Sequence, residues 1–353
     1  MDAASATAAC TTALAVGACC IFQSAAAALP AAARITAITV YPLKSGRGVS
    51  VETAVLDERG LAFDRLWMVV EGRGAFLSQR RAPKLAVVEA ALPSSHAEPL
   101  RLQAPGMPPL SVPVVTEQHS ASATVRVWDD HVLGYDQGDE AAAWFQHFLG
   151  VEGARLVRMA DGARRECARK YAGRGALTAF SDGFPLLLTS EASLAELNRK
   201  LTARVGSKPT EMRNFRPNLT MSGSDLAPFA EDAWGSIRVG AGGVDFGVVK
   251  PCARCKIPTV DQSTGVPDGA GAGIKDDDEG GGPQGEPIAT LRTFRTGKLL
   301  GYKSKKKHHD VFFGQNLVVN SPVGSVVSVG DAVVPVARPW YSRGVHGVHY
   351  VWA

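Results

Sequence analysis

The sequence predicts an α+β fold that is predominantly β-sheet. Gly and Pro are frequent, with 37 and 21 copies among 353 residues, and they interrupt the chain at short intervals. Most segments between these interruptions are short and rich in β-branched residues, which is typical of strands. The length is typical of two domains or one large domain.

Composition and charge exclude several protein classes. Apolar residues make up 45% of the chain and charged residues 20%, which excludes disorder, collagen and a coiled coil as the main architecture. The net charge of +4 is too small to indicate nucleic-acid binding. Six cysteines do not make a disulfide scaffold at this length, and they indicate a reducing compartment.

The first residues of the chain form an apolar, Ala-rich leader. Residues 3–33 carry no charge, and Ala8–Leu29 is about long enough to span a bilayer. Three interpretations stay open: a disordered leader, a signal anchor or a processed peptide. Arg34, Lys44 and Arg47 follow the leader, so an anchor would leave the globular part facing the cytosol. We therefore expect a cytosol-facing protein, either soluble or tethered to an intracellular membrane.

From Arg34 onward the pattern changes to short strands. We expect strands at 34–41, 66–70, 76–78, 85–92, 100–103, 110–115, 125–128 and 132–135. Two pairs of these strands are expected to form hairpins, one around Glu71–Gly74 and one around Asp129-Asp130.

Two later segments predict α-helices. In Asp139–Leu149, apolar side chains recur at i and i+4, Asp139 is expected to cap the helix, and Gly150 to end it. The second helix is expected from Ser190 to about Leu201, entered from a buried strand at 186–190.

The rest of the chain again predicts strands, with one short helix. We expect strands at 237–239, 244–250, 257–260, 312–319 and 326–336, and a short helix at 288–294. Gly265–Glu286 is rich in Gly, Pro and Asp, and is expected to be a solvated insertion rather than an acidic metal loop.

Cys252 and Cys255 form one C-x-x-C pair, for which three chemistries remain open. A zinc site would need further ligands, and the candidates His308 and His309 are adjacent, which rarely suits one metal. A dithiol redox pair normally opens a helix, whereas the segment after Cys255 predicts a strand. The third chemistry is a single thiolate that binds a redox metal, with cations nearby at Lys250, Arg254 and Lys256.

Five motifs occur in a distinctive order along the chain. They are Tyr41-Pro42-Leu43-Lys44-Ser45, Gly60–Trp67, Asn214–Leu219, Pro251–Cys255 and Phe313-Gly314-Gln315-Asn316, with Ser181-Asp182 and Leu188–Leu194 between them. Their order and spacing resemble the MOSC-domain molybdenum proteins, and most closely the amidoxime-reducing-component family, which is commonly mitochondrial. The resemblance covers about residues 34–337. It implies a MOSC-type β-barrel lobe with an additional mixed α/β N-terminal lobe, and the mitochondrial outer membrane as a possible place of tethering.

The resemblance also implies lobes that are not contiguous in sequence. Lys44 and Cys252 must meet at one cofactor, so the opening segment must pack against the C-terminal half. We expect 34–66 and 157–338 to form the barrel lobe, and 67–156 the second lobe. The leader 1–33 and the tail 339–353 lie outside both.

The cofactor that the resemblance implies is the molybdenum cofactor, a pyranopterin phosphate whose dithiolene sulfurs hold molybdenum. By its position in the motif, Cys252 would be the protein ligand of the metal, and Cys255 a small buried side chain. An anionic cofactor is bound best by charge-assisted hydrogen bonds. The matching family positions are Lys44, Ser45, Arg65, Arg216 and Asn218.

The implied reaction is a two-electron reduction that converts N–OH to N–H and releases water. Its substrates would be amidoximes and hydroxylamines, and nitrite reduction to nitric oxide is a second expected activity. We hypothesise that Asp182 faces the metal and handles protons, although an Asp before Gly183 can also simply form a turn. The alternative function is a MOSC-type cofactor carrier or sulfur-transfer module.

The sequence contains no haem, flavin or dinucleotide motif, so electrons must come from another protein. In the family they come from cytochrome b5 and its NADH-dependent reductase. We hypothesise that one basic tract helps this acidic partner to dock, with an ordinary solvated loop as the alternative. The tract consists of Lys303, Lys305, Lys306, Lys307, His308 and His309.

Overall fold

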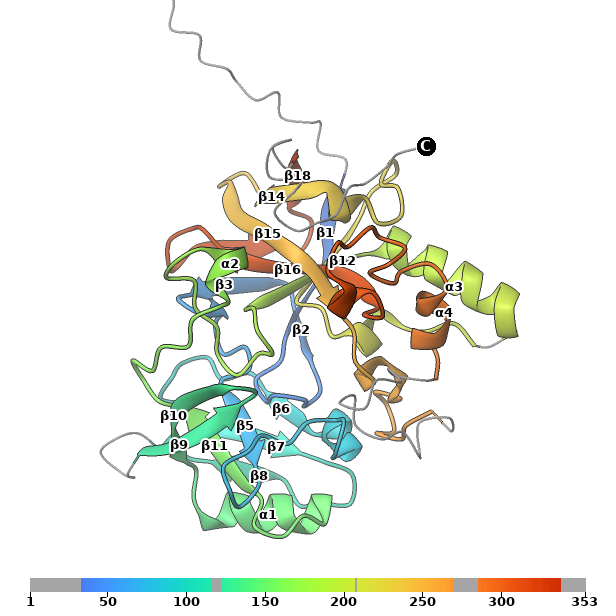
Figure 1. The fold of residues 1–353 in the computed structure, drawn as a ribbon. Coiled ribbons are helices and arrows are strands. Elements are labelled where there is room, and N and C mark those ends of the chain that lie inside the picture. Colours follow the sequence, from blue (N-terminus) through green and yellow to red (C-terminus); the bar gives the residue numbers. More distant parts are fainter. Residues whose placement is uncertain (1–32, 116–121, 207, 269–284, 338–353) are drawn as a thin grey trace, which may run out of the picture.

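The structure, a computed structural model, describes residues 33–115, 122–206, 208–268 and 285–337. These residues form two lobes, with the larger one above the smaller one in Figure 1. Strands dominate both lobes, so the predicted α+β, predominantly β fold is confirmed. The leader and the tail lie outside the described residues, as does most of the Gly265–Glu286 insertion.

The larger lobe is a closed β-barrel. Among the described residues, seven strands follow the order β13-β12-β16-β15-β14-β18-β1, and β1 pairs again with β13. Strands β12 and β13 are parallel, and the other neighbours are antiparallel. The strands are β1 (Ala33–Val40), β12 (Leu186–Ser190), β13 (Leu219–Ser222), β14 (Trp234–Val239), β15 (Val244–Ala253), β16 (Phe312–Val319) and β18 (Ala332–Ala337).

The alternation of side chains explains the barrel core. In β1, Ile35 and Ile38 are fully buried, whereas Arg34 and Thr36 face solvent. Successive side chains of a strand point to opposite faces. The irregularity of β1 between Ile35 and Ala37 brings Ile38 to the same interior as Ile35, although the two are three residues apart. At the end of β1 the short strand β2 (Val49–Val51) is added, and a small sheet of β17 (Val326–Ser328), β3 (Thr53–Asp57) and β4 (Gly60–Leu61) lies beside it.

The smaller lobe contains two sheets and one helix. The first sheet has the order β5 (Trp67–Val70), β11 (Arg155–Met159), β10 (Asp130–Asp136) and β9 (Ser122–Val127). The second has the order β6 (Glu89–Ala91), β7 (Leu100–Gln103) and β8 (Leu110–Val112). Helix α1 (Asp139–Leu149) lies at the bottom of this lobe in Figure 1, and its Trp144 and Phe145 belong to the lobe's core.

The remaining helices cover the barrel. They are α2 (Arg169–Ala172), α3 (Glu191–Val205) and α4 (Ile288–Arg292), with 3-10 turns η2 (Met212–Phe215), η3 (Ala230–Ala233), η4 (Ile257–Thr259) and η7 (Lys305–Lys307). The 3-10 turn η1 (Pro83–Val87) belongs to the smaller lobe, whose core contains its Leu85. Helices α3 and α4 lie side by side in Figure 1. They share a small apolar cluster with the stacked rings of Phe215 and Phe313.

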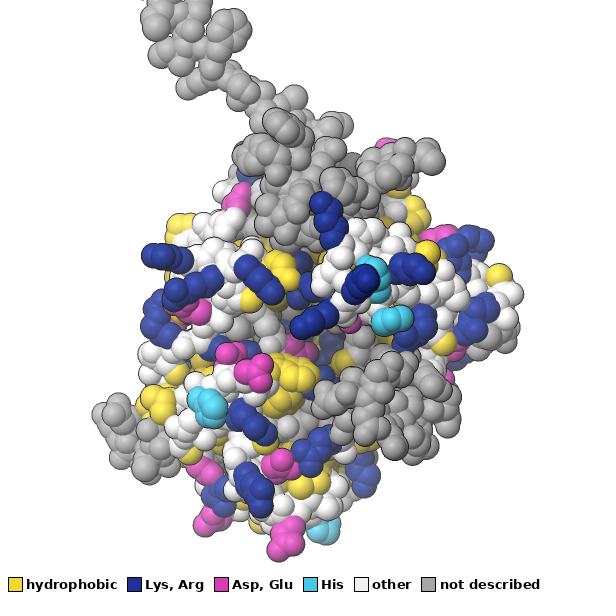
Figure 2. Space-filling model, viewed as in Figure 1, with side chains coloured by type: hydrophobic (Ala, Val, Ile, Leu, Met, Phe, Trp, Pro, Cys, Tyr) yellow, Lys and Arg dark blue, Asp and Glu magenta, His cyan; other side chains and the backbone are white. Residues whose placement is uncertain are grey.

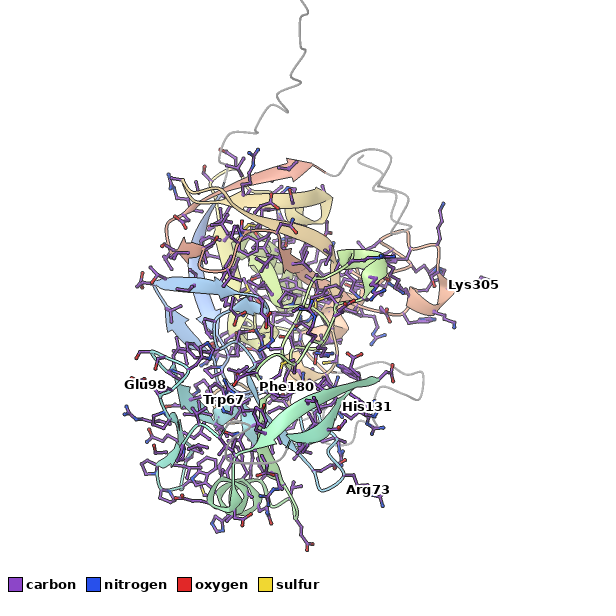
Figure 3. The ribbon with its side chains drawn as sticks, turned by 90° about the vertical axis from the view of Figure 1, so that its left-hand side faces the viewer. Trp67, Arg73, Glu98, His131, Phe180 and Lys305 are labelled. Atoms are coloured by element: carbon purple, nitrogen blue, oxygen red, sulfur yellow. The ribbon has the colours of Figure 1, made fainter. Side chains whose placement is uncertain are left out.

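The two lobes meet where the chain crosses between them. Lys44 N–H donates to the carbonyl of Trp67 (2.7 Å), and Phe180 N–H donates to the carbonyl of Arg65 (3.0 Å). Figure 3 shows Trp67 and Phe180 between the barrel and the smaller lobe, and both are fully buried. Strand β11 extends the four-stranded sheet of the smaller lobe to Met159. We therefore propose that the smaller lobe ends near residue 160.

Several predicted elements need correction. The first part of 85–92 is the 3-10 turn η1, because Pro83 fixes the backbone at its start. The strand expected at 257–260 is the 3-10 turn η4, which contains Pro258. The strand expected at 326–336 is split into β17 and β18 by a turn at Gly330, whose φ is 89°. Asp139 does not cap α1, because Gly138 is the N-cap and the Asp139 carboxylate pairs with Arg155.

Helix α3 begins after Ser190, as expected, but the Ser190 hydroxyl makes no capping bond and the helix continues to Val205. The predicted hairpin around Asp129-Asp130, helix α1 and strand β16 are confirmed. The strand expected at 76–78 is not formed, and the hairpin expected around Glu71–Gly74 is reduced to an isolated antiparallel bridge between Val70 and Phe76. Of the helices in the described part of the chain, none is long and apolar enough to cross a membrane.

Candidate functional site

One pocket brings together residues from five separate segments of the chain. All seven residues singled out in the sequence line it, and its volume is about 770 Å³ including the open mouth. They are Lys44, Ser45, Arg65, Asp182, Arg216, Asn218 and Cys252.

Three of these residues have a backbone conformation that side chains other than glycine rarely adopt. The φ angles of Ser45, Arg65 and Arg216 are 67°, 49° and 57°. Such conformations cost about 1–3 kcal/mol each and cluster at functional sites, where the surrounding structure holds them. Here Gln79 Nε2 donates to the Ser45 carbonyl (2.8 Å), and Arg65 N–H donates to the Tyr41 carbonyl (2.6 Å).

Tyr41 organises the cationic wall of the pocket. Its ring lies 4.2 Å from the guanidinium of Arg65 and 4.3 Å from that of Arg216, and its hydroxyl donates to the Pro217 carbonyl (3.1 Å). Arg65 also donates to the Asn218 side-chain oxygen (2.8 Å). The two guanidinium groups are thus oriented by the protein itself. Burial lowers the pKa of Arg216 to about 10, so it is still charged at neutral pH.

The buried carboxylate of Asp64 holds Tyr41, Arg65 and Asn218 together. It accepts hydrogen bonds from Tyr41 N–H (2.9 Å) and Asn218 Nδ2 (3.0 Å), and it pairs with Arg65 (2.5 Å). The Asn218 side chain therefore has partners within the protein on both its oxygen and its nitrogen. Its oxygen accepts from Arg65 and so helps to orient that guanidinium.

Lys44 and Asp182 form an ion pair of 2.7 Å at the pocket wall. The Lys44 side chain is 6% exposed and that of Asp182 is 60% exposed. Burial lowers the pKa of Lys44 to about 8, although the charge of Asp182 raises it. Desolvation raises the pKa of Asp182, but the charge and hydrogen bond of Lys44 outweigh it and hold that pKa well below its usual range. At neutral pH the proton is therefore on Lys44.

Arg165 holds the loop that carries Asp182. This buried guanidinium donates to the carbonyl oxygens of Ala179 (3.0 Å), Ser181 and Asp182 (2.8 Å), and it pairs with Asp130 (2.7 Å) at the tip of the β9–β10 hairpin. Sequence reasoning missed this residue, because nothing in its neighbours marks it as different from a surface arginine. The smaller lobe thus positions Asp182 through one side chain.

Cys252 lies near the end of β15, where the ladder with β16 is irregular at two places, between Val248 and Lys250 and between Pro251 and Ala253. Such bulges re-aim side chains at the rim of a barrel. The Cys252 thiol is free and half-buried, and Arg254 Nη1 donates to its sulfur at 3.1 Å.

Arg254 is itself fixed, because its Nη2 donates to the Phe215 carbonyl (2.8 Å). Cys255 is a free thiol as well, and burial raises its pKa. In the described part of the chain, no three His, Cys, Asp or Glu side chains gather as a metal site. The zinc interpretation therefore gains no support from these residues.

Three buried polar atoms at the pocket have no hydrogen-bond partner. They are Arg216 Nη2, Arg254 Nε and the hydroxyl of Ser181, all on residues that line the pocket. Buried polar groups are almost always hydrogen-bonded, so unpaired donors that line one cavity indicate a polar ligand. Two of the three belong to cations, which favours an anionic ligand.

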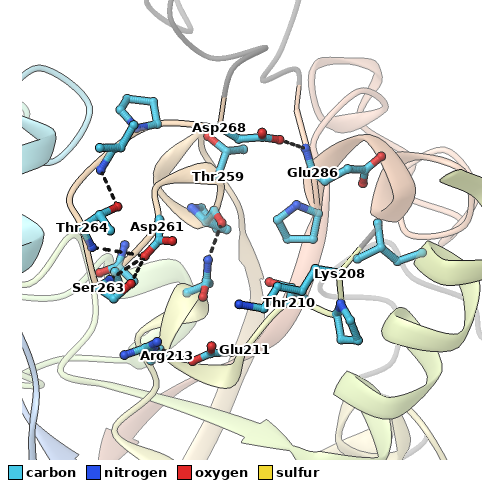
Figure 4. Close-up of a pocket in the computed structure, with 18 residues that line it drawn as sticks. Lys208, Thr210, Glu211, Arg213, Thr259, Asp261, Ser263, Thr264, Asp268 and Glu286 are labelled. Carbon is cyan, nitrogen blue, oxygen red and sulfur yellow. Dashed lines mark hydrogen bonds and ion pairs between the residues drawn. The ribbon is translucent and has the colours of Figure 1, made fainter. Parts of the chain in front are cut away.

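A larger cavity of about 1310 Å³ lies on the other side of η4, and none of the seven residues lines it. Figure 4 shows that its carboxylates are already engaged: Asp261 accepts from Ser263 and Thr264, and Asp268 from the Glu286 N–H. Its polar groups therefore offer less to a ligand than those around Cys252.

The basic tract lies on the barrel lobe, and Figure 3 shows Lys305 projecting away from the body of the molecule. Figure 2 shows Lys and Arg side chains spread over the barrel half of the face that it draws. Lys307 is half-buried, and its ammonium group donates to the Tyr171 hydroxyl (2.8 Å). The tract is thus anchored to a tyrosine rather than being a wholly solvated loop.

The family models match two consecutive parts of the chain, and β1, which belongs to the barrel in the structure, falls within the first of them. A model described as the MOSC N-terminal beta barrel domain matches residues 32–152, and one described as the MOSC domain matches residues 177–334. The chain belongs to the MOSC-domain family. The membership expected from the five motifs is thereby confirmed.

Curated relatives of this MOSC-domain chain include mitochondrial amidoxime reducing components. Mitochondrial amidoxime reducing component 2 of Rattus norvegicus is 33% identical over 270 residues, which are 74% of this chain and 72% of the relative. Mitochondrial amidoxime-reducing component 1 is 29% identical over 307 residues in Mus musculus and 30% over 307 residues in Homo sapiens. These matches cover 85% of this chain and 81% and 82% of the relatives.

Proposed function

We propose that the protein is a molybdenum-cofactor-dependent reductase of N-hydroxylated compounds such as amidoximes and hydroxylamines. The observation that carries the proposal is the pocket, in which a half-buried thiol faces cations supplied by distant segments. The names of the relatives, amidoxime reducing components, support the same class of reaction. Nitrite reduction to nitric oxide is a second activity of the same site.

The residues of the pocket fit the cofactor. A pyranopterin phosphate is an anion with many hydrogen-bonding edges, and the unpaired N–H groups of Arg216 and Arg254 are suited to such a ligand. Cys252 supplies a soft sulfur ligand, which suits a redox metal. We assign cofactor binding to Lys44, Ser45, Arg65, Arg216 and Asn218, and metal ligation to Cys252. When bound, the cofactor supplies the two-electron chemistry.

The reaction consumes two electrons and two protons, breaks the N–O bond and releases water. Lys44 holds a proton on its buried ammonium group at the pocket wall. Asp182 is exposed and ionised, so it links Lys44 to solvent and can pass a proton to it. We therefore assign proton delivery to the pair, with Asp182 as the catalytic residue on the solvent side.

Electrons come from a separate protein, for which we propose cytochrome b5 with its NADH-dependent reductase. The exposed lysines of the basic tract lie next to Lys307, which contacts Tyr171 at the edge of the pocket. An acidic partner that docks there would be brought close to the cofactor site. We expect the protein to face the cytosol, soluble or tethered to a membrane such as the mitochondrial outer membrane.

Elemental analysis tests this function. Full-length protein made in a host that synthesises the cofactor should contain about one molybdenum per chain, Cys252→Ser should contain far less, and Cys255→Ser should match the wild type. Zinc without molybdenum would refute the proposal. Molybdenum without turnover of benzamidoxime by the cytochrome b5 system would leave the alternative, a MOSC-type cofactor carrier or sulfur-transfer module.

Replacing Asp182 tests its role separately. Asp182→Ala should keep molybdenum bound and lower turnover, whereas unchanged turnover would remove Asp182 from the mechanism. Neutralising Lys303, Lys305 and Lys306 together should weaken the salt dependence of cytochrome-driven turnover. If the salt dependence stays the same, the tract does not dock the partner.

A further inference from the structure

Three lysines converge on the ring of Tyr171 at one edge of the Cys252 pocket. The ammonium nitrogens of Lys170, Lys250 and Lys307 lie 4.9, 5.0 and 5.2 Å from the ring centroid. These residues come from α2, β15 and η7, which are far apart in the sequence. We call these three lysines the lysine rim. An aromatic ring attracts cations to its face, which explains how three like charges are held together.

The lysine rim is continuous with the wall of the pocket. Phe184 lines the pocket, and its ring lies 6.3 Å from that of Tyr171 in an edge-to-face arrangement. Lys250 lies over both rings and precedes Cys252 by two residues in β15. The charges of the lysine rim therefore act on any ligand that approaches the Cys252 thiol.

Few carboxylates oppose these cations. Asp182 is engaged by Lys44, and Asp310 is near enough to Lys307 and Lys250 for their charges to act on it. Deeper in the pocket the charged side chains of Arg65, Arg216 and Arg254 add to the positive field. A concave site lined by one sign of charge concentrates ligands of the opposite sign and repels those of the same sign.

We propose that the lysine rim selects substrates by charge: it admits neutral and anionic N-oxygenated compounds and disfavours cationic ones. This inference rests on the proposed function. Amidoximes are neutral near pH 7, whereas the amidines formed from them are protonated. Reduction therefore turns a neutral substrate into a cation inside a positively charged pocket, which favours release of the product. Nitrite, an anion, is attracted by the same field.

Charged thiol reagents measure this field without any turnover. The full-length chain, prepared without cofactor, is treated with an anionic or a cationic methanethiosulfonate, and modification of Cys252 is followed by mass spectrometry. Trypsin cleaves after Arg254 and so separates Cys252 from Cys255. A lysine one Debye length away, about 8 Å in physiological salt, changes the ratio of the two rates about fivefold. The anionic reagent should therefore react several-fold faster than the cationic one, relative to free cysteine.

Methionine variants test the individual lysines while keeping an unbranched side chain on the aromatic ring. Lys250→Met should lower the ratio of rates several-fold, and adding Lys170→Met should lower it further. Lys200→Met is the matched control, because Lys200 also lies over an aromatic ring, 4.8 Å from the Phe294 centroid, and does not line this pocket. Its ratio should equal that of the wild type.

The holoenzyme then shows whether the field selects substrates. Benzamidoxime is compared with a benzamidoxime that carries a quaternary ammonium group, whose KM should be several-fold higher in the wild type. Lys250→Met should narrow that difference in KM and strengthen inhibition by benzamidinium. In the Lys200→Met control, both quantities should change less than twofold. A ratio of thiol rates equal to that of free cysteine, or one insensitive to both lysine variants, would overturn the inference. If the wild-type holoenzyme did not turn over benzamidoxime while the ratio of thiol rates was as expected, the result would instead contradict the proposed function.

Discussion

Replacing Lys44 by Met should change how the free energy of unfolding depends on pH. In the folded wild type Lys44 loses its proton near pH 8, because burial lowers its pKa to about 8 from 10.5. Between these two pH values the unfolded chain binds more protons than the folded chain, so the wild type gains stability as the pH rises. Lys44→Met lacks this titrating group, so its free energy of unfolding does not show this increase with pH.

The size of the effect follows from the two pKa values. The folded and unfolded values differ by about 2.5 units, and each unit corresponds to about 1.4 kcal/mol, which makes about 3 kcal/mol over the whole interval. The Lys44 side chain is 6% exposed, so solvent screens little of this. The free energy of unfolding of the wild type minus that of Lys44→Met should thus rise by about 3 kcal/mol from pH 7.5 to 10.5.

Urea unfolding of the cofactor-free chain at a series of pH values measures this difference. Lys200→Met serves as the control, because the Lys200 side chain is 35% exposed and pairs with Glu196 at the surface. Its difference from the wild type should stay flat over the same interval. A flat difference for Lys44→Met would show that Lys44 titrates as an ordinary exposed lysine, and the proton-delivery role would lose its physical basis.

Three further substitutions test residues in and around the pocket. Arg165→Met removes a buried partner from Asp130 and from three carbonyls, and should lower the free energy of unfolding by about 3 kcal/mol; a thermal scan with an unchanged Tm would contradict this. Gly314→Ala should destabilise by about 2 kcal/mol or more in urea unfolding, since φ is 76° and the new Cβ would lie 2.8 Å from the Leu188 carbonyl oxygen; wild-type stability would show that the backbone relaxes freely. Arg254→Met removes the donor to the Cys252 sulfur and should weaken metal retention about tenfold with an unchanged circular dichroism spectrum; wild-type metal content after dialysis would argue against it.

Local patterns predicted much of the fold because the forces behind them are local. The alternation of buried Ala33 and Ile35 with exposed Arg34 and Thr36, and the left-handed Gly150 after α1, are readable from a few adjacent residues. Two of the errors occurred where a β-branched run contains or follows a proline. Pro83 and Pro258 favour 3-10 turns over the strands that their neighbours favour.

The residues of the candidate site were found through the family motifs, whereas their mutual arrangement was not readable from them. Lys44 alone resembles a surface charge, and its pairing with Asp182 joins positions 138 residues apart. Arg165 is the clearest omission, since its four partners lie in two segments that fold against it only in three dimensions. Long-range contacts of this kind have no periodicity that a single sequence could reveal.

The protein alone arranges the cationic wall of the pocket, and this arrangement favours tight binding of an anionic ligand. Ser45, Arg65 and Arg216 occupy left-handed conformations, and the Tyr41 ring lies between the two guanidinium groups without help from a ligand. The cost of this arrangement, about 1–3 kcal/mol for each strained residue, is met by folding rather than by binding. An anionic ligand then loses little of its binding energy to ordering side chains. On the proposed function, tight retention of the cofactor would therefore depend on Tyr41, although the ring itself carries no charge and need not contact the ligand.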